Sequence, residues 1–204
     1  MMKNILIILA GYPATGKSTF CKGLLKLYPN APIISPDDIK EEIWDEVGFK
    51  NAAEKADLEV TRIWPLYYKR LEEQMAAGGL VITDYPFSDK QKSFLLYECE
   101  KNNYSALTIR FVGNLQRIYQ RSLSRDLSPS RHLGHLVSCY KKGDVLKNRM
   151  QADQLVTFDI LKNRCISKGY GEFQLGDLIE VDATDIATVN FEGLVKQVNK
   201  YIVK

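Results

Sequence analysis

The hydrophobic positions of the chain form two kinds of segment that alternate along its length. Short uninterrupted apolar runs are separated by longer stretches in which apolar residues recur every three or four positions. An uninterrupted run is typical of a parallel strand that is covered on both faces. The pattern predicts five strands, at residues 4–10, 32–35, 80–84, 106–112 and 178–181.

The longer amphipathic stretches predict helices between these strands. In residues 17–28, Phe20, Leu24 and Leu27 share one helical face, and Pro29 ends the helix. The same periodicity predicts helices at residues 37–47, 52–77, 88–101, 115–124, 144–168 and 186–203. Strands that alternate with helices indicate a mostly parallel sheet wrapped by helices, and we expect a single domain over residues 1–204.

Composition excludes several classes of protein. The chain has 204 residues, of which 45% are hydrophobic and 26% charged, which is close to the globular average and argues against a disordered, fibrous or coiled-coil protein. The apolar run at residues 5–10 is much shorter than the roughly 20 residues of a membrane span, and a glycine-rich turn follows it. The four cysteines form no CxxC pair, so we expect reduced thiols in a cytoplasmic protein without a zinc site.

Charge is unevenly distributed along the chain. The net charge of +3 is too small to indicate a nucleic-acid partner by itself. Residues 37–59 contain nine acidic and three basic side chains, whereas residues 114–149 contain eight basic and two acidic ones. Two solvated helical faces would produce this pattern, and so would an anion-binding element that faces a carboxylate-rich one.

A phosphate-binding motif follows the first predicted strand. Residues 11–18 read GYPATGKS, which matches the Walker A pattern GxxxxGK[ST]. Its glycines allow consecutive backbone N–H groups to point at phosphate oxygens, at the start of a helix whose N-terminus is partially positive. Lys17 adds a charge for the terminal phosphates, and Ser18 places a hydroxyl on Mg²⁺. We therefore expect MgATP as cofactor, although the motif does not distinguish ATP from GTP. The expected binding residues are Gly11, Pro13, Ala14, Thr15, Gly16, Lys17, Ser18 and Thr19.

Two carboxylates follow the second predicted strand, at the edge where ligands bind in open α/β sheets. Asp37 and Asp38 in this position are suited to accept a proton from an attacking hydroxyl. Asp37 would instead serve only as the cap of the following helix if its carboxylate bonded the helix N-terminus. We expect Asp37 as the general base and Asp38 as a substrate contact.

Asp84 ends the third predicted strand. An acid in this position of a P-loop protein commonly lies near Mg²⁺, so Asp84 and Ser18 are the candidate metal residues. The alternative is a turn residue without a ligand. The segment 181–185 (VDATD) follows the last strand, where a short polar loop would border the adenine base.

A basic segment completes the candidate chemistry. Arg117, Arg121 and Arg125 are spaced four residues apart, on one face of the predicted helix at residues 115–124 and its end, and guanidinium groups suit a transferring phosphoryl group. The following residues 127–143 mix Ser, Pro, Gly and His, which predicts a mobile loop that closes over the nucleotide. A solvated helix face is the alternative. The candidate residues are Arg121 and Arg125 for catalysis, with Arg121 also on the nucleotide, and Arg131 and His132 for the substrate.

These motifs resemble P-loop kinases of the group that includes polynucleotide 5′-kinases, zeta toxins and chloramphenicol phosphotransferase. The resemblance covers nearly the whole chain in element order and rests on GYPATGKS, ISPDDIK, VITDYPF, RSLSRD and SRHLGH. It implies a three-layer α/β P-loop NTPase fold, with a five-stranded parallel sheet in the order 2-3-1-4-5, helices on both faces and an arginine-bearing lid at about residues 125–143. It also implies that Asp37 is the general base and that Arg121, Arg125 and Arg131 match lid arginines.

The resemblance has one informative departure. Polynucleotide kinases of this group carry an arginine before the double Asp and another two residues after it, where this chain has Pro36 and Lys40. An acidic helix after Asp37 also opposes a polyanion. We therefore expect an ATP- and Mg²⁺-dependent phosphotransferase that acts on a hydroxyl of a small or nucleotide-like molecule. A polynucleotide 5′-hydroxyl kinase, an NTP-hydrolysing switch and a nucleotide-binding protein remain alternatives, and the residues name no protein partner.

Overall fold

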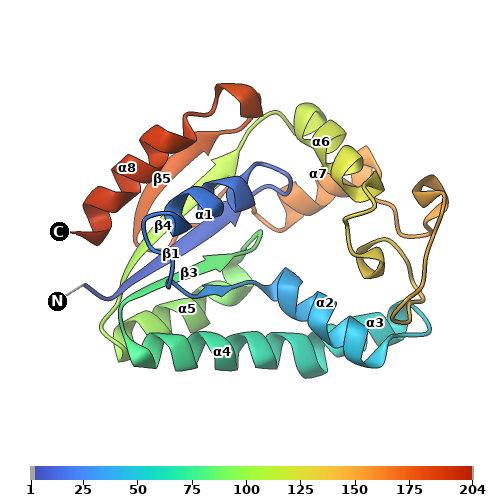
Figure 1. Ribbon diagram of the computed structural model, residues 1–204, viewed down its shortest axis with the longest axis horizontal. Helices are drawn as coiled ribbons and strands as arrows, with labels where there is room; N and C mark the ends of the chain where they lie inside the picture. The colour runs from blue at the N-terminus through green and yellow to red at the C-terminus, as the bar shows by residue number, and fades with distance from the viewer. Residues whose placement is uncertain (1–2, 204) are drawn as a thin grey trace.

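The computed structural model describes residues 3–203, which contain one five-stranded parallel sheet in the order β2-β3-β1-β4-β5 (Figure 1). This order confirms the one that the resemblance implied. All four strand pairings are parallel. The strands are β1 (Ile5–Gly11), β2 (Ile33–Ile34), β3 (Leu80–Asp84), β4 (Ser105–Val112) and β5 (Asp177–Asp182).

Helices cover both faces of this sheet, as expected for an apolar parallel sheet (Figure 1). The helices are α1 (Lys17–Leu25), α2 (Pro36–Val47), α3 (Ala52–Leu58), α4 (Trp64–Ala77), α5 (Asp89–Lys101), α6 (Leu115–Leu127), α7 (Phe158–Ser167) and α8 (Phe191–Ile202). Alternate residues of β1 divide between two cores. Leu6 and Ile8 pack with α2, α4 and α5, whereas Ile7 and Leu9 pack with α1 and α8. Within residues 3–203, none of the helices is both long and apolar enough to cross a membrane.

The expected helix over residues 52–77 contains an interruption. α3 and α4 are joined by a π-helical segment, Glu59–Ile63, in which the Trp64 N–H donates to the carbonyl oxygen five residues earlier. Pro65 explains the change of pitch, because proline has no N–H and its ring clashes with the carbonyl four residues before it. The π turn moves Glu59 into the neighbourhood of α2.

The expected helix over residues 144–168 is wrong for its first half. Helix α7 begins at Phe158, with Thr157 as its cap, and before it lies only a short 3₁₀ turn, Arg149–Gln151. The Arg149 guanidinium donates to the carbonyl oxygens of Arg131 and Pro129, and Ala152 is buried against the core of α2 and α4. These tertiary contacts outweigh the modest helix propensity of the segment.

Candidate active site

The loop between β1 and α1 has the backbone of a phosphate cradle. Gly11, Ala14 and Gly16 all have positive φ angles, of 100°, 54° and 91°. The Thr15 hydroxyl and the Lys17 Nζ both donate to the carbonyl oxygen of Tyr12, over 2.7 and 2.8 Å. Lys17 therefore folds back along the loop and holds its charge at the mouth of the cradle, beside the N-terminus of α1.

Gly11 is required by close approach as well as by its φ angle. A Cβ on Gly11 would lie 2.0 Å from the Phe111 carbonyl oxygen of β4, with which Gly11 is in register. We expect Gly11→Ala to destabilise the protein by roughly 3 kcal/mol or more, because neither backbone can move without breaking the sheet. Gly143→Ala is the matched control, since Gly143 has a φ of 95° and nothing within 4 Å of the added Cβ. Urea unfolding should separate the two variants, and equal losses would show that the contact with Phe111 does not matter.

Lys17 and Asp84 form the floor of the site. The Lys17 side chain is buried, with 8% of the residue exposed. Burial lowers the pKa of Lys17, and the charges of Asp84 and Asp37 act in the opposite direction. Burial raises the pKa of Asp84 to about 6, assisted by Asp37 and Asp38 and opposed by Lys17 and by the Ser18 hydroxyl. Asp84 reaches this position because the register of β1 and β3 places it beside Leu9, just before the loop.

The start of α2 leaves the carboxylate of Asp37 available. Ser35 caps the helix, since its hydroxyl accepts from the Asp37 N–H over 3.2 Å, and Pro36 takes the first helical position. Asp37 is therefore not the cap, which was the alternative that the sequence left open. Its side chain is 39% exposed, and its carboxylate lies 3.3 Å from Lys40 Nζ.

Positive neighbours keep Asp37 ionised. Burial would raise its pKa, but the charges of Lys40, His135 and Arg131 outweigh burial and hold the pKa of Asp37 well below its usual range. Asp38, the neighbouring residue, is exposed, and its pKa is raised by partial burial and by the charges of Glu41 and Asp37.

Lys40 and Tyr85 are site residues that the sequence analysis did not select. Lys40 is buried, with 8% exposed, and its Nζ bonds the Tyr85 hydroxyl at 3.2 Å and lies 3.8 Å from Glu59. Burial lowers the pKa of Lys40, and the charges of Asp37, Tyr85 and Glu59 raise it further than burial lowers it. The three-residue spacing between Asp37 and Lys40 on a helix was the available signal.

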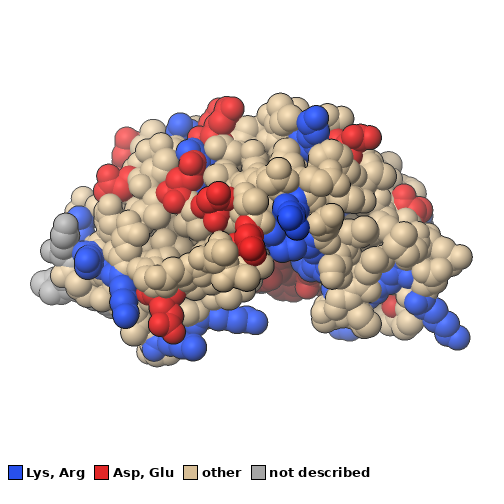
Figure 2. All heavy atoms as spheres, turned by 90° about the horizontal axis from the view of Figure 1, so that it is seen from above, with Lys and Arg blue, Asp and Glu red and all other residues tan. Residues whose placement is uncertain are grey.

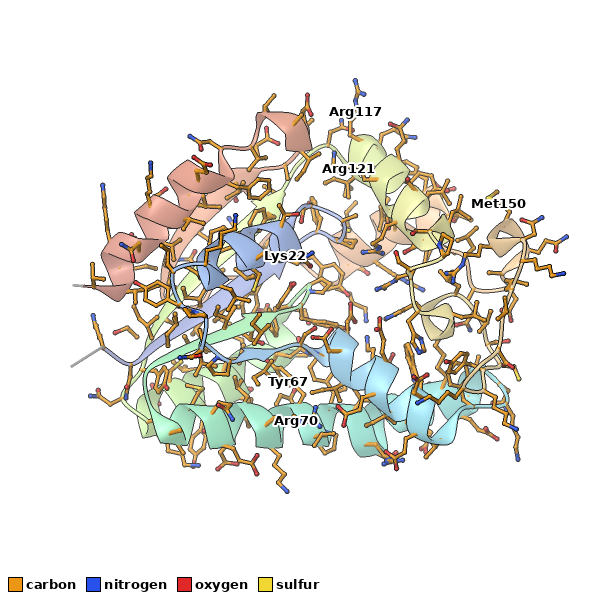
Figure 3. The ribbon with its side chains drawn as sticks, in the orientation of Figure 1. Lys22, Tyr67, Arg70, Arg117, Arg121 and Met150 are labelled. Carbon is orange, nitrogen blue, oxygen red and sulfur yellow. The ribbon has the colours of Figure 1, made fainter. Side chains whose placement is uncertain are left out.

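The three candidate arginines have different environments. Arg121 donates to the carbonyl oxygens of Ala14, Ala183 and Thr184, so it ties the phosphate loop to the loop after β5. In Figure 3, Arg121 points toward the phosphate loop, whereas Arg117 points away from it into solvent.

Arg125 and Arg131 approach each other at the end of α6. Arg125 donates to Asp126, and Arg131 lies 3.6 Å from the same carboxylate and 3.7 Å from Glu41. Burial lowers the pKa of Arg131, as does the charge of Arg125. Among the described residues, the Nε of Arg131 has no hydrogen-bond partner.

The segment after α6 is docked on α2 in this structure, where the sequence predicted a mobile loop. His135 Nε2 lies 2.8 Å from Glu41, His132 Nε2 lies 3.0 Å from Asp45, and Tyr140 pairs with Phe49 in an antiparallel bridge. The cause is a set of buried side chains in this segment, namely Leu133, Leu136 and Tyr140. His132 is thus a contact between this segment and α2, with its ring tilted against that of Trp44.

These groups surround a cleft of about 690 Å³ at the carboxyl ends of the strands. Of the site residues expected from sequence, all except Gly11 and His132 line it. Figure 2 shows basic and acidic side chains that meet near the middle of the molecule. The charged residues on the wall are Lys17, Lys22, Asp37, Asp38, Glu41, Asp84, Arg121, Arg125 and Arg131.

Comparison with known proteins supports the same view of the fold. Residues 6–99 match the model of a family described as an AAA domain, a region that includes the loop, Asp37 and Asp84 and ends before α6. No curated protein matches the sequence.

Solved structures resemble the whole chain. A protein of Chloroflexus aurantiacus, described as "a putative kinase", has a TM-score of 0.73 and 22% identity over 97% of this chain and 98% of its own. The APS kinase of Mycobacterium tuberculosis, solved with AMPPNP and APS, has a TM-score of 0.56 and 11% identity over 99% of both chains. The shikimate kinase of Bacteroides thetaiotaomicron has a TM-score of 0.52 and 17% identity over 100% of both. With its Walker A loop, its AAA-domain match and its strand order, this chain therefore has the fold of the P-loop kinases, as the resemblance in its sequence predicted.

Proposed function

We propose that this protein is a phosphotransferase that moves the γ-phosphoryl group of ATP to a hydroxyl group of a small molecule. One observation carries the proposal: the Lys17 ammonium group and the carboxylate of Asp37, which pairs with Lys40 and is not used as the helix cap, line the same cleft. A nucleotide-binding protein without an acceptor has no need for a second, ionised carboxylate opposite the phosphate loop.

The nucleotide side of the proposal rests on the loop and on Arg121. The loop presents backbone N–H groups and Lys17 to the phosphates. Arg121 holds Ala14 against the loop that follows β5, at Ala183 and Thr184. Its contribution to nucleotide binding would therefore include the positioning of the loop that borders the base.

The carboxylate-rich floor fits a magnesium ion. The raised pKa of Asp84 reflects a desolvated group beside two other carboxylates, which is an unfavourable arrangement that a divalent cation relieves. Ser18 and Asp84 would hold the ion, and a site with few protein ligands suits Mg²⁺, which keeps several waters and binds phosphate oxygens. When bound, the ion supplies positive charge to the β- and γ-phosphates.

We expect Asp84→Asn to stabilise the ligand-free protein while it removes the Mg²⁺-dependent part of nucleotide binding. The pKa of Asp84 in the folded protein, about 6, lies above its ordinary value, so the folded protein favours the protonated carboxyl. The stability that this preference provides is complete at low pH and is lost as the pH rises through about 6. At pH 7.5 the asparagine should raise stability by about 2–3 kcal/mol, or Tm by roughly 4–10 °C.

Thermal melts in EDTA at pH 7.5 and pH 4 provide the measurement for Asp84→Asn. The gain should disappear at pH 4, and Asp177→Asn, an exposed carboxylate at the start of β5, should show no gain at either pH. A lower Tm at pH 7.5, or full Mg²⁺-dependent stabilisation by ATP, would contradict the assignment.

On the acceptor side, Asp37 orients the hydroxyl that attacks the γ-phosphorus. The acceptor oxygen bonds to phosphorus as the bond to the β–γ bridging oxygen breaks, and the hydroxyl proton passes to Asp37 late in the transfer. An Asp37 held ionised by Lys40 is a ready hydrogen-bond acceptor but a weak base, which suits a dissociative transition state that needs little early deprotonation. Arg125 and Arg131 lie where charge develops on the transferred group, and residues 125–143 remain our proposed lid.

The acids at the cleft mouth favour a small acceptor over a nucleic acid. Asp38 and Glu41 lie on the α2 side of the cleft, where they would repel the phosphates of a polynucleotide. Coupled detection of ADP release across nucleosides, sugars, antibiotics, hydroxy acids and a 5′-hydroxyl oligonucleotide tests the proposal. Stimulation by a small molecule would support it. Slow ATP turnover that no acceptor stimulates would favour an NTP-hydrolysing switch, and binding without turnover would favour a sensor.

A further inference from the structure

A second cavity lies beyond Asp37 on the side away from the phosphate loop. It has a volume of about 500 Å³ and is bordered by α2, α3, the π segment, residues 153–156, α7 and Tyr170. A smaller cavity of about 180 Å³ lies between it and the main cleft. Asp37 and Arg131 border both the main cleft and the smaller cavity. Arg164 and Tyr170 border both the smaller cavity and the second cavity. Figure 1 shows α2 and α7 on opposite sides of this end of the sheet.

The lining of this second cavity is basic. Four of its side chains are lysine or arginine, and two are acids, Glu59 and Asp153. Asp153 accepts hydrogen bonds from Ser138, and Glu59 lies 3.8 Å from Lys40. Neither acid is therefore directed at a ligand.

Two of the four basic side chains are already committed. Lys40 serves Asp37, Tyr85 and Glu59, as described above. Lys55 donates to the Val137 carbonyl oxygen and to Gln154, over 3.0 and 2.6 Å. Burial lowers the pKa of Lys55 to about 8, although Glu59 opposes the shift. Lys55 therefore mainly holds the segment after α6 in place.

Arg164 and Lys168 are the two uncommitted cations. They lie four residues apart along and just beyond α7, so they lie on one face, and both border the cavity. Within residues 3–203, neither side chain forms a hydrogen bond or an ion pair with another residue. A free guanidinium and a free ammonium group at the wall of a cavity form a pair of donors for one anionic group.

Aromatic and apolar side chains form part of the cavity wall. Trp44, Tyr85, Tyr170, Val156 and Ile160 border it together with Arg164 and Lys168, and Asp37 lies on the smaller cavity that adjoins it. Such walls suit a carbon skeleton or a ring, with specificity supplied by the few polar groups at each end.

Resting on the proposed function, we propose that the phosphate acceptor is a small molecule that carries an anionic group, a carboxylate or a phosphate. Arg164 and Lys168 bind that group, the aromatic walls contact the carbon skeleton, and the reacting hydroxyl lies at Asp37. The cavity thereby selects a compact anion, while the acids Asp38 and Glu41 at the mouth exclude a long polyanion.

The first arm of the test compares acceptors in pairs that differ only in charge. Nucleoside 5′-monophosphates are assayed against nucleosides, sugar phosphates against sugars, and hydroxy acids against their amides, by ADP release. For the best pair, we expect kcat/KM to be at least about tenfold higher for the anionic member, which a single charge-assisted hydrogen bond supplies. Phosphate and carboxylate pairs also distinguish the two anions.

The variants of this arm are Arg164→Gln and Lys168→Gln. Each should raise KM for the anionic member by roughly 10- to 100-fold, leave kcat within a few-fold, and remove the preference over the neutral member. Arg164→Lys should recover part of the loss. Lys162→Gln is the matched control, because Lys162 is exposed on α7 and does not border the cavity.

The second arm measures binding without turnover. Protein loaded with AMPPNP and Mg²⁺, so that the phosphate loop is filled, is titrated with inorganic phosphate by calorimetry. Wild type and Lys162→Gln should bind one phosphate, and Arg164→Gln and Lys168→Gln should bind at least tenfold more weakly. Because all three positions are exposed, thermal melts of the variants should match wild type.

The outcomes separate this inference from the proposed function. Transfer to neutral acceptors with an affinity that the Arg164 and Lys168 variants leave unchanged would overturn the anion site but keep the kinase. Phosphate binding that depends on Arg164, without transfer to any acceptor, would support the anion site and reject the kinase. Absence of phosphate binding by the AMPPNP-loaded wild type, or better use of the oligonucleotide than of every small molecule, would overturn the inference.

Discussion

Replacement of Lys17 by alanine should weaken ATP binding and lower turnover by two or more decades. The ammonium group is buried at the mouth of the cradle and bonds only a loop carbonyl oxygen, so it is placed to contact the β- and γ-phosphates. A charge preorganised in a desolvated site contributes roughly 3 kcal/mol to a transition state of this kind. Binding should be measured by calorimetry with ATP, and turnover by ADP release.

Lys26→Ala is the control for Lys17→Ala. Lys26 is an exposed lysine at the end of the same helix, so its loss should change neither binding nor turnover. Thermal melts must accompany both variants, because Lys17 also offsets the charges of Asp84 and Asp37. A Lys17→Ala protein that binds and turns over ATP as wild type does would reject the phosphate-cradle assignment.

Asp37→Asn should lower turnover by roughly 10²–10⁴-fold and leave ATP affinity nearly unchanged. Asparagine keeps the shape of the side chain, but it cannot take the proton of the acceptor hydroxyl and it binds that hydroxyl less strongly. The expected loss equals the usual contribution of general base catalysis to the rate. The loss should fall toward the lower limit if Asp37 mainly orients the hydroxyl, because its low pKa makes it a weak base.

Stability provides a second readout for Asp37→Asn. The pKa of Asp37 is depressed in the folded protein, so its ion pair with Lys40 stabilises the fold above about pH 4 and is lost as pH falls below that value. The difference in Tm between wild type and Asp37→Asn should therefore be largest near neutral pH and shrink in acid. Loss of a helix cap does not confound this comparison, since Ser35 provides the cap.

Asp38→Asn is the internal control for the acceptor side. Asp38 is exposed beside Asp37 on the same turn, and its loss should reduce turnover much less. If Asp37→Asn retained full activity on an identified acceptor, the base assignment would pass to Asp84, which lies on the same cleft with a raised pKa.

Local sequence determined the sheet and the phosphate loop. Uninterrupted apolar runs require burial on both faces, and the residues of GYPATGKS allow one backbone path between a strand and a helix. The strand ends at Asp37 and Asp84 were also predictable, because parallel strands bring their carboxyl ends to one edge of the sheet.

Only the tertiary structure decided what each polar side chain bonds. The sequence left Asp37 open as the helix cap, but in the structure Ser35, two residues earlier, takes that role and leaves the Asp37 carboxylate free of the helix N-terminus. Arg121 and Arg125 have the same helical spacing, yet Arg121 bonds three carbonyl oxygens and Arg125 bonds a carboxylate. The partners of Arg121 lie 62 to 107 residues away in the sequence, so they leave no periodic signal.

The irregular segments depended on the tertiary structure for the same reason. Residues 128–157 have weak helix propensity, and their path follows from contacts with α2 made by side chains such as His135 and Tyr140. Lys40 bonds Tyr85 and lies near Glu59, residues that are distant in the sequence and that only the packing of β3 and the π segment against α2 brings to it. Backbone propensity differs by less than about 1 kcal/mol per residue, so the burial of a few side chains decides the conformation wherever hydrophobic periodicity is absent.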